Sequence, residues 1–314
     1  GTKRSTKTFQ KRVGKGILRT QRVSKLAKTK KVAGKLFNSN AYPKMCYGIQ
    51  AMGVPPTTLG KLRTAAAKAA GLQTQGACCT TSISLSLGVH KDPAIRIRCD
   101  LIKEWLVMWK GLTVSQRFSL MVCWDKQKAR LDKAQYKWRI VSGPIRAMIA
   151  SLLDIHWGPI APHIWRDAEQ QVWEIDEDAQ VGRFMTLIAE QIAKQLWSNA
   201  THHYCGSGLQ NGADTSVLQA HLQRLAKAGQ NQERGLLLLS ACGGCWTNQR
   251  CADAGYPVAP TCNRCNGAPE SVSHMVWECP DNDAVSDPVL KKAIQNSDHL
   301  KVRAHEPHAV NFQC

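Results

Sequence analysis

The stretch from Asp92 to Trp109, Asp-Pro-Ala-Ile-Arg-Ile-Arg-Cys-Asp-Leu-Ile-Lys-Glu-Trp-Leu-Val-Met-Trp, decides the fold class of this 314-residue chain. An aspartate followed by proline is a typical helix start, because the carboxylate accepts from free backbone amides and proline fits the first turn. Apolar residues then recur at steps of three or four, at Ile95, Cys99, Ile102, Leu106 and Trp109. This period predicts an amphipathic helix, with more helical sequence to about residue 135.

The helical period extends to both sides of this stretch. A helix is predicted over 59–71, capped by Thr57 or Thr58, with Leu59, Leu62, Ala66 and Ala69 on one face and Gly71 at its end. Others are expected from Val23 on the stripe Leu26, Val32, Ala33, Leu36 and Phe37, on Val181, Met185, Ile188, Ile192 and Leu196, and from Asp214 or Thr215 through Leu218, Leu222 and Leu225. Residues 1–22 are expected to form a loop, or a helix that needs a partner. Because few segments alternate strictly, the chain is predicted to be mainly α.

Three tryptophans recur every eight residues in a segment with a poor helical period. Trp157, Trp165 and Trp173 lie within 138–178. Exposed tryptophan can stack on nucleic-acid bases, but acids such as Asp167 and Glu169 lie beside these rings and would repel phosphate. The segment is therefore interpreted as an irregular region in which the rings pack onto a core.

The net charge of +19 is concentrated at one end of the chain. Residues 1–91 contain 18 Lys or Arg and no acid, because the first acid is Asp92; the rest of the chain holds 24 bases and 23 acids. Such a block favours a polyanionic partner, most commonly nucleic acid. A solvated basic tail and an organelle transit peptide are the competing interpretations.

Several cations of this block lie off the apolar stripes of the expected helices. A helix with one buried face and one lysine face can lie against a phosphate backbone. The predicted nucleic-acid-binding residues are Lys25, Lys28, Lys31, Lys35, Lys44, Lys61, Arg63 and Lys68. The predicted partner is RNA or an RNA/DNA duplex, contacted through phosphates because the deep groove of duplex RNA offers little access to base edges.

The cysteines provide the strongest local motif. Cys262, Cys265, His274 and Cys279 are spaced C-x2-C-x8-H-x4-C. Three thiolates and one imidazole suit zinc, and four protein ligands leave no open position, so the predicted cofactor is a structural zinc ion. Cys242 and Cys245 form another C-x2-C pair, so the set Cys242, Cys245, Cys262 and Cys265 is an alternative ribbon-like site.

The thirteen cysteines also bear on the compartment. Their odd number and metal-like spacing favour a reducing environment, and the predicted localisation is intracellular, either nuclear or cytoplasmic. No apolar run approaches the roughly 20 residues of a membrane span, so no membrane partner is expected. The chain begins with Gly1 rather than Met, which favours a fragment of a longer protein.

Three stretches resemble the C-terminal part of a non-LTR (LINE-type) retrotransposon reverse transcriptase. Asn40-Ala-Tyr-Pro-Lys-Met-Cys-Tyr-Gly48 resembles the Pro-x-x-x-Tyr-Gly element of the thumb. Trp246-Thr247, Arg250 and Gly255 resemble the lead-in to the terminal zinc element. The cysteine and histidine motif, with Glu270 and Trp277-Glu-Cys-Pro280, resembles the CCHC zinc knuckle itself. The likeness runs from about residue 20 to 285, and 110–230 has no residue-by-residue match.

The resemblance implies a nucleic-acid-binding fragment of an RNA-directed DNA polymerase whose other partners are the remaining parts of that polymerase. Polymerisation needs carboxylates that hold two metal ions, and the sequence has no Asp-Asp pair and no acid before Asp92. No polymerase activity is therefore expected of the chain on its own. Two alternatives stay open: a stand-alone basic zinc-containing nucleic-acid-binding protein, and a zinc-containing scaffold for protein interactions.

Together these features predict a helical thumb-like bundle, a helical linker and a small zinc-knuckle element. The expected parts are a basic N-terminal segment (1–22), a thumb-like helical domain (23–135), a Trp-rich linker and helical region (136–230), a zinc-knuckle domain (231–285) and a polar tail (286–314).

Overall fold

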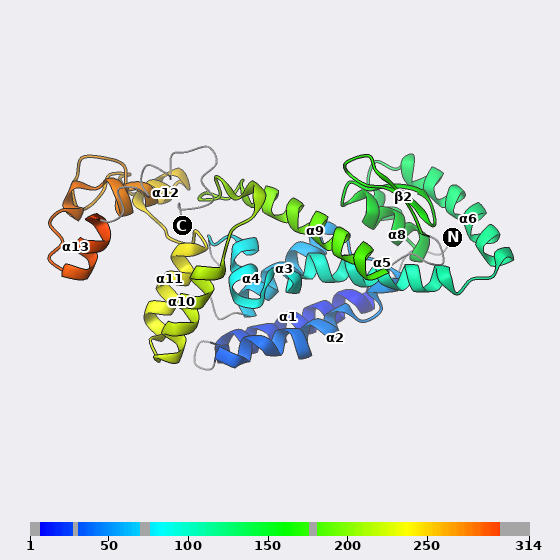
Figure 1. Cartoon of the computed structure of the whole chain (residues 1–314), viewed down its shortest axis with the longest axis horizontal. Helices are drawn as coiled ribbons and strands as arrows, with labels where there is room; N and C mark the ends of the chain where they lie inside the picture. The colour runs from blue at the N-terminus through cyan, green and yellow to red at the C-terminus, as the bar shows by residue number, and fades with distance from the viewer. Residues whose placement is uncertain (1–6, 28–30, 70–75, 176–180, 296–314) are drawn as a thin grey trace. The chain divides into compact units, whose positions relative to one another are not determined.

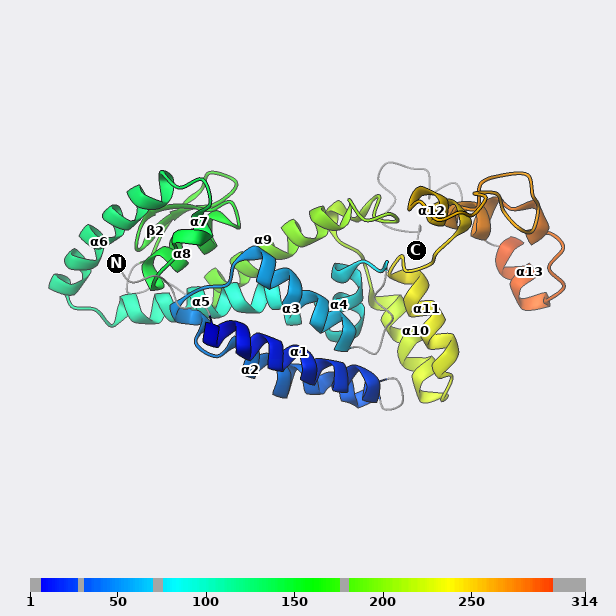
Figure 2. The ribbon, with the colours of Figure 1, turned by 180° about the vertical axis from the view of Figure 1, so that it is seen from behind.

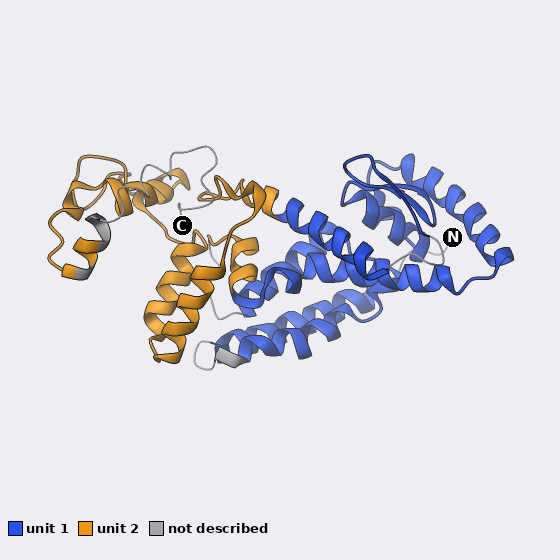
Figure 3. Cartoon of the chain, in the orientation of Figure 1, with its two compact units in different colours: residues 1–72, 86–196 blue, residues 73–85, 197–314 orange. Residues whose placement is uncertain are grey.

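The computed structural model describes residues 7–27, 31–69, 76–175 and 181–295 and is mainly α, as predicted (Figure 1). Helices make up 67% of it, and a small three-stranded sheet is the other regular element. The chain divides into two compact units (Figure 3). Unit 1 comprises residues 1–72 and 86–196, and unit 2 comprises residues 73–85 and 197–314.

The division differs from the expected domain limits. The limit expected at 135/136 falls within unit 1, and the one expected at 230/231 falls within unit 2. Short-range periodicity carries no information on such long-range contacts, and the segment 73–85 belongs with residues more than a hundred positions away. Of the expected polar tail, residues 296–314 lie outside the described residues.

The N-terminal part of unit 1 corrects one prediction. Of the two forms expected for residues 1–22, a loop or a helix that needs a partner, the described part takes the second, since α1 runs over Lys7–Ala27. The helix expected from Val23 through Phe37 is not continuous: residues 28–30 are not described, and short helices follow at Lys31–Gly34 (η1) and Phe37–Ala41 (η2). On the expected stripe, Ala33 and Phe37 are buried, but Leu26 and Leu36 are exposed; the side chain of Val32 lies outside the described residues.

The buried face of α1 explains why this helix is difficult to recognise in the sequence. Phe9, Val13, Gly16 and Thr20 face inward at steps of four, three and four, and two of them are not hydrophobic. The Thr20 hydroxyl donates to the Gly16 carbonyl at 2.9 Å, so it is satisfied within the helix. The helix packs against α2 (Tyr42–Cys46) and α3 (Pro56–Ala69), and it runs beside α2 in both views (Figure 2).

The helices predicted around Leu59 and Asp92 are confirmed. Leu59, Leu62, Ala66 and Ala69 are all buried in α3, while the expected end at Gly71 lies outside the described residues. The helix α5 (Pro93–Lys110) begins after Asp92, whose side chain accepts from the Ala94 amide at 2.8 Å. Ile95, Ile102, Leu106 and Trp109 are buried, and Cys99 is half-buried. The other helices up to residue 153 are η3 (Ile49–Ala51), α4 (Cys79–Leu87), η4 (Val89–Lys91), α6 (Val114–Asp132), α7 (Lys137–Ile140) and α8 (Pro144–Leu153).

The Trp-rich segment forms an antiparallel sheet that the sequence did not predict. Its strands, β1 (Gly158–Ala161), β2 (Ile164–Arg166) and β3 (Val172–Glu174), are only three or four residues long, so no alternation is visible. Trp157 and Trp165 are buried and meet Phe184 of α9 (Val181–Ala200), with ring centroids 5.6 and 5.5 Å away. The indole of Trp173 donates to Asp167 at 2.8 Å. The interpretation that the rings pack onto a core is confirmed for Trp157 and Trp165, whereas Trp173 is half-buried and meets Phe184 with ring centroids 6.0 Å apart.

Unit 2 contains a helical hairpin followed by an irregular C-terminal region. The hairpin is α10 (Ser216–Lys227) and α11 (Asn231–Ala241). The remaining elements are η5 (Leu209–Asn211), α12 (Asn248–Asp253), η6 (His274–Glu278), η7 (Pro280–Asn282) and α13 (Pro288–Gln295). Cys78, Trp197, Ala200 and Leu209 form a small buried cluster in this unit. Among the described helices of both units, none has the length and apolar character to cross a bilayer.

Candidate metal centre and cationic helix face

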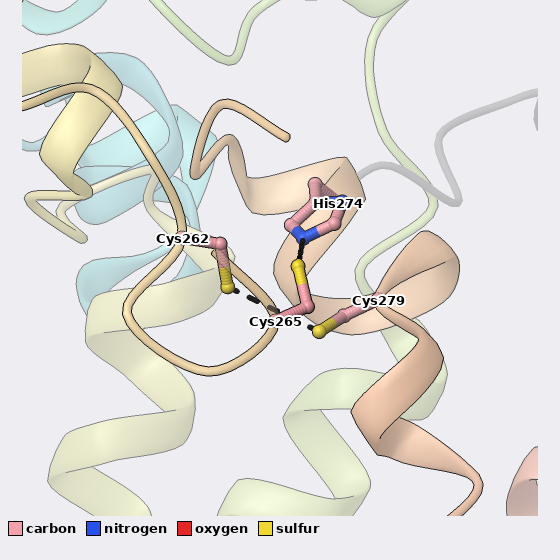
Figure 4. Close-up of side chains that lie close together, drawn as sticks. All are labelled: Cys262, Cys265, His274 and Cys279. Atoms are coloured by element: carbon pink, nitrogen blue, oxygen red, sulfur yellow. Dashed lines mark hydrogen bonds between the residues drawn. The ribbon is translucent and has the colours of Figure 1, made fainter. Parts of the chain in front are cut away.

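Four side chains near the C-terminal end of unit 2 converge on one point (Figure 4). Their ligand atoms, three Sγ and one imidazole nitrogen, all lie within 4.8 Å of one another. The sulfurs of Cys262 and Cys279 are 4.0 Å apart, and Cys265 Sγ is 3.3 Å from His274 Nε2. Cys262, His274 and Cys279 are buried, and Cys265 is half-buried. The structure therefore gathers all four residues of the predicted knuckle.

One half of this group is a tight turn. The Asn266 amide donates to the Cys262 carbonyl at 2.9 Å, and Asn266 has φ +52°, a left-handed conformation that asparagine tolerates better than most residues. The backbone amides of Cys265 and Arg264 donate to the Cys262 sulfur and lower the pKa of its thiol to about 6. Donors aimed at a sulfur favour the thiolate, which is the form that binds a metal.

The other half is a single helical turn fixed by hydrogen bonds. The Ser271 hydroxyl accepts from the His274 amide at 2.9 Å, and the Cys279 amide donates to the His274 carbonyl at 2.8 Å. Arg264, from the first half, donates to the Met275 carbonyl at 2.6 Å and to Asn282 Oδ1 at 2.8 Å. The arginine between the first two cysteines thus holds the two halves together.

The donor set and its spacing fit a zinc ion. Zn–S bonds of about 2.3 Å and Zn–N bonds of about 2.0 Å in a tetrahedron give S–S edges near 3.8 Å and S–N edges near 3.5 Å. The two short pairs above lie close to these values. Four protein donors leave no position for a substrate, so an ion held there would be structural.

The alternative all-cysteine set is not gathered in the described part of the chain. Cys242 and Cys245 do not belong to the group of potential ligands around Cys262 and Cys265. The carbonyl of Cys242 accepts from the Cys78 amide at 2.8 Å, and the carbonyl of Cys245 accepts from Arg250 at 2.9 Å. These two cysteines belong to a backbone junction centred on Arg250.

The lead-in motif, which consists of Trp246-Thr247, Arg250 and Gly255, forms part of this junction. Thr247 caps α12 by accepting from the Arg250 amide, and Gly255, with φ +84°, ends the helix in a conformation that favours glycine. The Arg250 guanidinium is buried and donates to the carbonyls of Gly243, Cys245 and Gly76 at 2.8, 2.9 and 2.7 Å. The motif was visible in the sequence, but the backbone partners of Arg250 could not be read from the sequence.

Glu270 links this junction to the cysteine group. Its carboxylate accepts from the backbone amide and the side-chain amide of Asn248, at 3.2 and 3.3 Å, and its carbonyl accepts from the Gln249 amide at 3.3 Å. Asn248 also donates to the Thr261 carbonyl, next to Cys262, at 2.9 Å. The start of α12 is therefore tied to both edges of the knuckle turn.

A second candidate site is the outer face of α1 in unit 1. Its exposed cations are Lys7, Lys11, Lys15, Arg22 and Lys25. At 3.6 residues per turn they fall within about 80° of arc, opposite the four buried positions. Two further arginines are held at the flank: Arg19 donates to Asn40 Oδ1 at 3.0 Å, and Arg12 lies over the Tyr47 ring at 5.4 Å. The result is one continuous cationic face.

The predicted nucleic-acid-binding residues have different surroundings in the structure. Lys25, Lys35, Lys44, Lys61 and Lys68 are exposed. Arg63 is less available, because its Nε donates to the buried carboxylate of Asp92 at 3.0 Å. Lys28 and the side chain of Lys31 lie outside the described residues. Sequence reasoning missed Lys7, Lys11, Lys15 and Arg22, although their recurrence at steps of four and seven was a usable signal.

Comparison of the chain with protein-family models, with curated proteins and with solved structures finds no match. The features of the chain that bear on its function are therefore the cysteine and histidine group and the cationic face of α1.

Proposed function

We propose that this chain is a nucleic-acid-binding part of a retroelement RNA-directed DNA polymerase, that it contacts RNA or an RNA/DNA duplex, and that it holds one structural zinc ion. The observation that carries the proposal is the division of α1 into a buried face and an opposite cationic face. A solvated basic tail has no such division, because nothing fixes its lysines on one side.

The dimensions and charge of this face suit a phosphate backbone. From Lys7 to Lys25 the helix rises about 27 Å, at about 1.5 Å per residue. No acid precedes Asp92 in the sequence, so α1 carries no carboxylate that would neutralise its lysines. Exposed lysines without carboxylates beside them attract polyanions and release counterions when phosphates bind. The contacts would be sequence-independent.

The zinc ion would have a supporting role in this function. Few apolar side chains are buried between Cys262 and Cys279, so metal ligation would supply much of the local folding free energy. The ion would keep the two halves of the knuckle and the attached α12 junction in one conformation. The resemblance to the retroelement knuckle and its lead-in supports the family assignment within this proposal.

A salt titration tests the binding step. Fluorescence anisotropy with an RNA/DNA hybrid should give an affinity that falls steeply with salt, by about three decades between 50 and 200 mM if roughly six phosphates are contacted. A flat salt response would contradict the proposal and favour a scaffold for protein interactions.

The proposal also includes the absence of polymerase activity in the isolated chain. No Asp-Asp pair exists in the sequence to hold two catalytic metal ions. We expect primer extension by the purified 314-residue chain to stay at background with magnesium or manganese present. Extension above that background, in a preparation free of other polymerases, would contradict this part of the proposal.

A further inference from the structure

Three half-exposed aromatic side chains surround the Arg250 junction in unit 2. Tyr204, Trp246 and Tyr256 are 45%, 42% and 53% exposed. The Arg250 guanidinium lies 4.9 Å from the Tyr204 ring centroid and 4.8 Å from that of Trp246. Trp246 and Tyr256 meet edge to face, with centroids 6.0 Å apart at 87°. Large rings at this exposure leave part of their apolar area facing water.

Close contacts hold Arg250 and Trp246 in place. The guanidinium is fixed by three carbonyls, as described above, and Gly76 fits beneath Trp246 only because it lacks a side chain. A Cβ at Gly76 would lie 2.7 Å from the indole nitrogen of Trp246, and Gly76 has φ +79°. The carbonyl of Gly76 is also 2.6 Å from His203 Nε2. Arg250 and Trp246 therefore lose little conformational entropy when a ligand stacks beside them.

The charge of Arg250 selects among the ligands that stack on aromatic rings. Among the described residues, Arg250 is paired with carbonyls and rings and forms no ion pair with a carboxylate. A guanidinium fixed between two rings repels ammonium or methyl-lysine ligands. It attracts ligands that combine a flat ring with negative charge, and an unpaired nucleotide has both properties.

We propose that Tyr204, Trp246 and Tyr256 form a stacking surface for unpaired bases of single-stranded nucleic acid, with Arg250 as the fixed charge between the rings. This inference rests on the proposed function, because it assigns a second contact to the same nucleic-acid partner. Bases in a duplex are already stacked on each other, so this surface recognises single strands. Burial raises the pKa of Tyr204 and the nearby Asp253 carboxylate raises it further, so an acid as well as Arg250 lies near the rings and stacking dominates the binding.

The test measures binding of an oligouridylate and of an RNA/DNA hybrid to the full chain. Tyr256→Ala removes one ring, which meets Trp246 edge to face. We expect oligouridylate binding to weaken about 5-fold or more. The salt slope and the hybrid affinity should stay unchanged, because no phosphate contact is lost. Tyr256→Phe keeps the ring and should bind like the wild type.

Val258→Ala is the matched control, because Val258 is an exposed aliphatic side chain two positions further along the chain. It should leave both affinities unchanged, and all variants should retain the zinc content of the wild type. Wild-type affinity for oligouridylate in both Tyr256→Ala and Trp246→Ala would overturn the proposed stacking surface. It would also be overturned if the chain bound a proline-rich peptide through these rings and did not bind oligouridylate. Loss of salt-dependent hybrid binding instead contradicts the function proposed for α1, so the two failures are distinguishable.

Discussion

The four side chains of the cysteine and histidine group were predicted as the favoured ligand set, but spacing alone left the four-cysteine set open as an alternative. Spacing made Cys262 and Cys265 common to both alternatives. Only coordinates place His274 and Cys279 beside them and put the carbonyls of Cys242 and Cys245 in other hydrogen bonds. The reason is physical: a ligand set is defined by distances in space, whereas the sequence gives separations along the chain.

Zinc content of single-residue variants follows from this geometry. We expect the wild type to bind one zinc ion per chain, and His274→Ala to lose most of it, because three thiolates no longer close the tetrahedron. Cys242→Ser should keep the ion. Elemental analysis of purified, dialysed protein gives the measurement. Zinc lost in Cys242→Ser and kept in His274→Ala would reverse the assignment and favour the four-cysteine ribbon.

Arg250 illustrates a second limit at the residue scale. The motif around it was visible in the sequence, but its partners are the carbonyls of Gly243, Cys245 and Gly76. Every residue type has a carbonyl, so no sequence pattern reveals which ones an arginine contacts. The aromatic rings around Arg250 escaped the sequence analysis for the same reason, because Tyr204 is distant from Trp246 in the sequence.

At the scale of elements, the sequence predicted well-populated apolar stripes and missed sparse ones. The helix after Asp92 and the helix around Leu59 have four or more apolar residues on one face, and both are confirmed. The buried face of α1 contains Gly16 and Thr20 in place of two apolar residues, so the helical period of apolar residues is difficult to recognise there. The three short strands around Trp165 are below the length at which alternation can be recognised.

Two glycines of α1 provide a matched test of its packing. Gly14 is exposed with nothing near its missing Cβ, whereas a Cβ on Gly16 would overlap the buried Met45 side chain. Gly14→Ala should raise the free energy of unfolding by about 0.5–1 kcal/mol, since alanine loses less backbone entropy in a helix. Gly16→Ala should lower it by about 1–3 kcal/mol through overpacking.

Urea unfolding monitored by circular dichroism measures both changes as shifts of the midpoint. The two variants carry the same chemical change two positions apart, so each serves as the control for the other. Equal midpoints for Gly14→Ala and Gly16→Ala would mean that α1 does not pack on Met45 through this face.

At the scale of the whole molecule, charge predicted a partner class but not the surface that would bind it. The 18 cations of residues 1–91 are evident in the sequence. The face formed by Lys7, Lys11, Lys15, Arg22 and Lys25 depends on a helix that the sequence left as one of two alternatives. The division into units was equally hidden, because residues 73–85 fold with residues 197–314. Contacts over such separations leave no periodic signal in the chain.

Charge reversal on the outer face of α1 tests most directly whether this helix face binds nucleic acid. The triple variant Lys11→Glu, Lys15→Glu and Arg22→Glu changes three exposed cations opposite the buried face. The matched control reverses three exposed cations, Lys126 and Arg130 of α6 and Lys133 at its C-terminal cap, and so makes the same change in net charge.

Affinity for an RNA/DNA hybrid is measured at several salt concentrations for the wild type and both triple variants. We expect the α1 variant to bind at least about 10-fold more weakly and its salt slope to be shallower by about 3, one for each lost phosphate contact, whereas the α6 variant should change far less. Equal losses in the two variants, or wild-type binding by the α1 variant, would contradict the claim that this helix face binds nucleic acid.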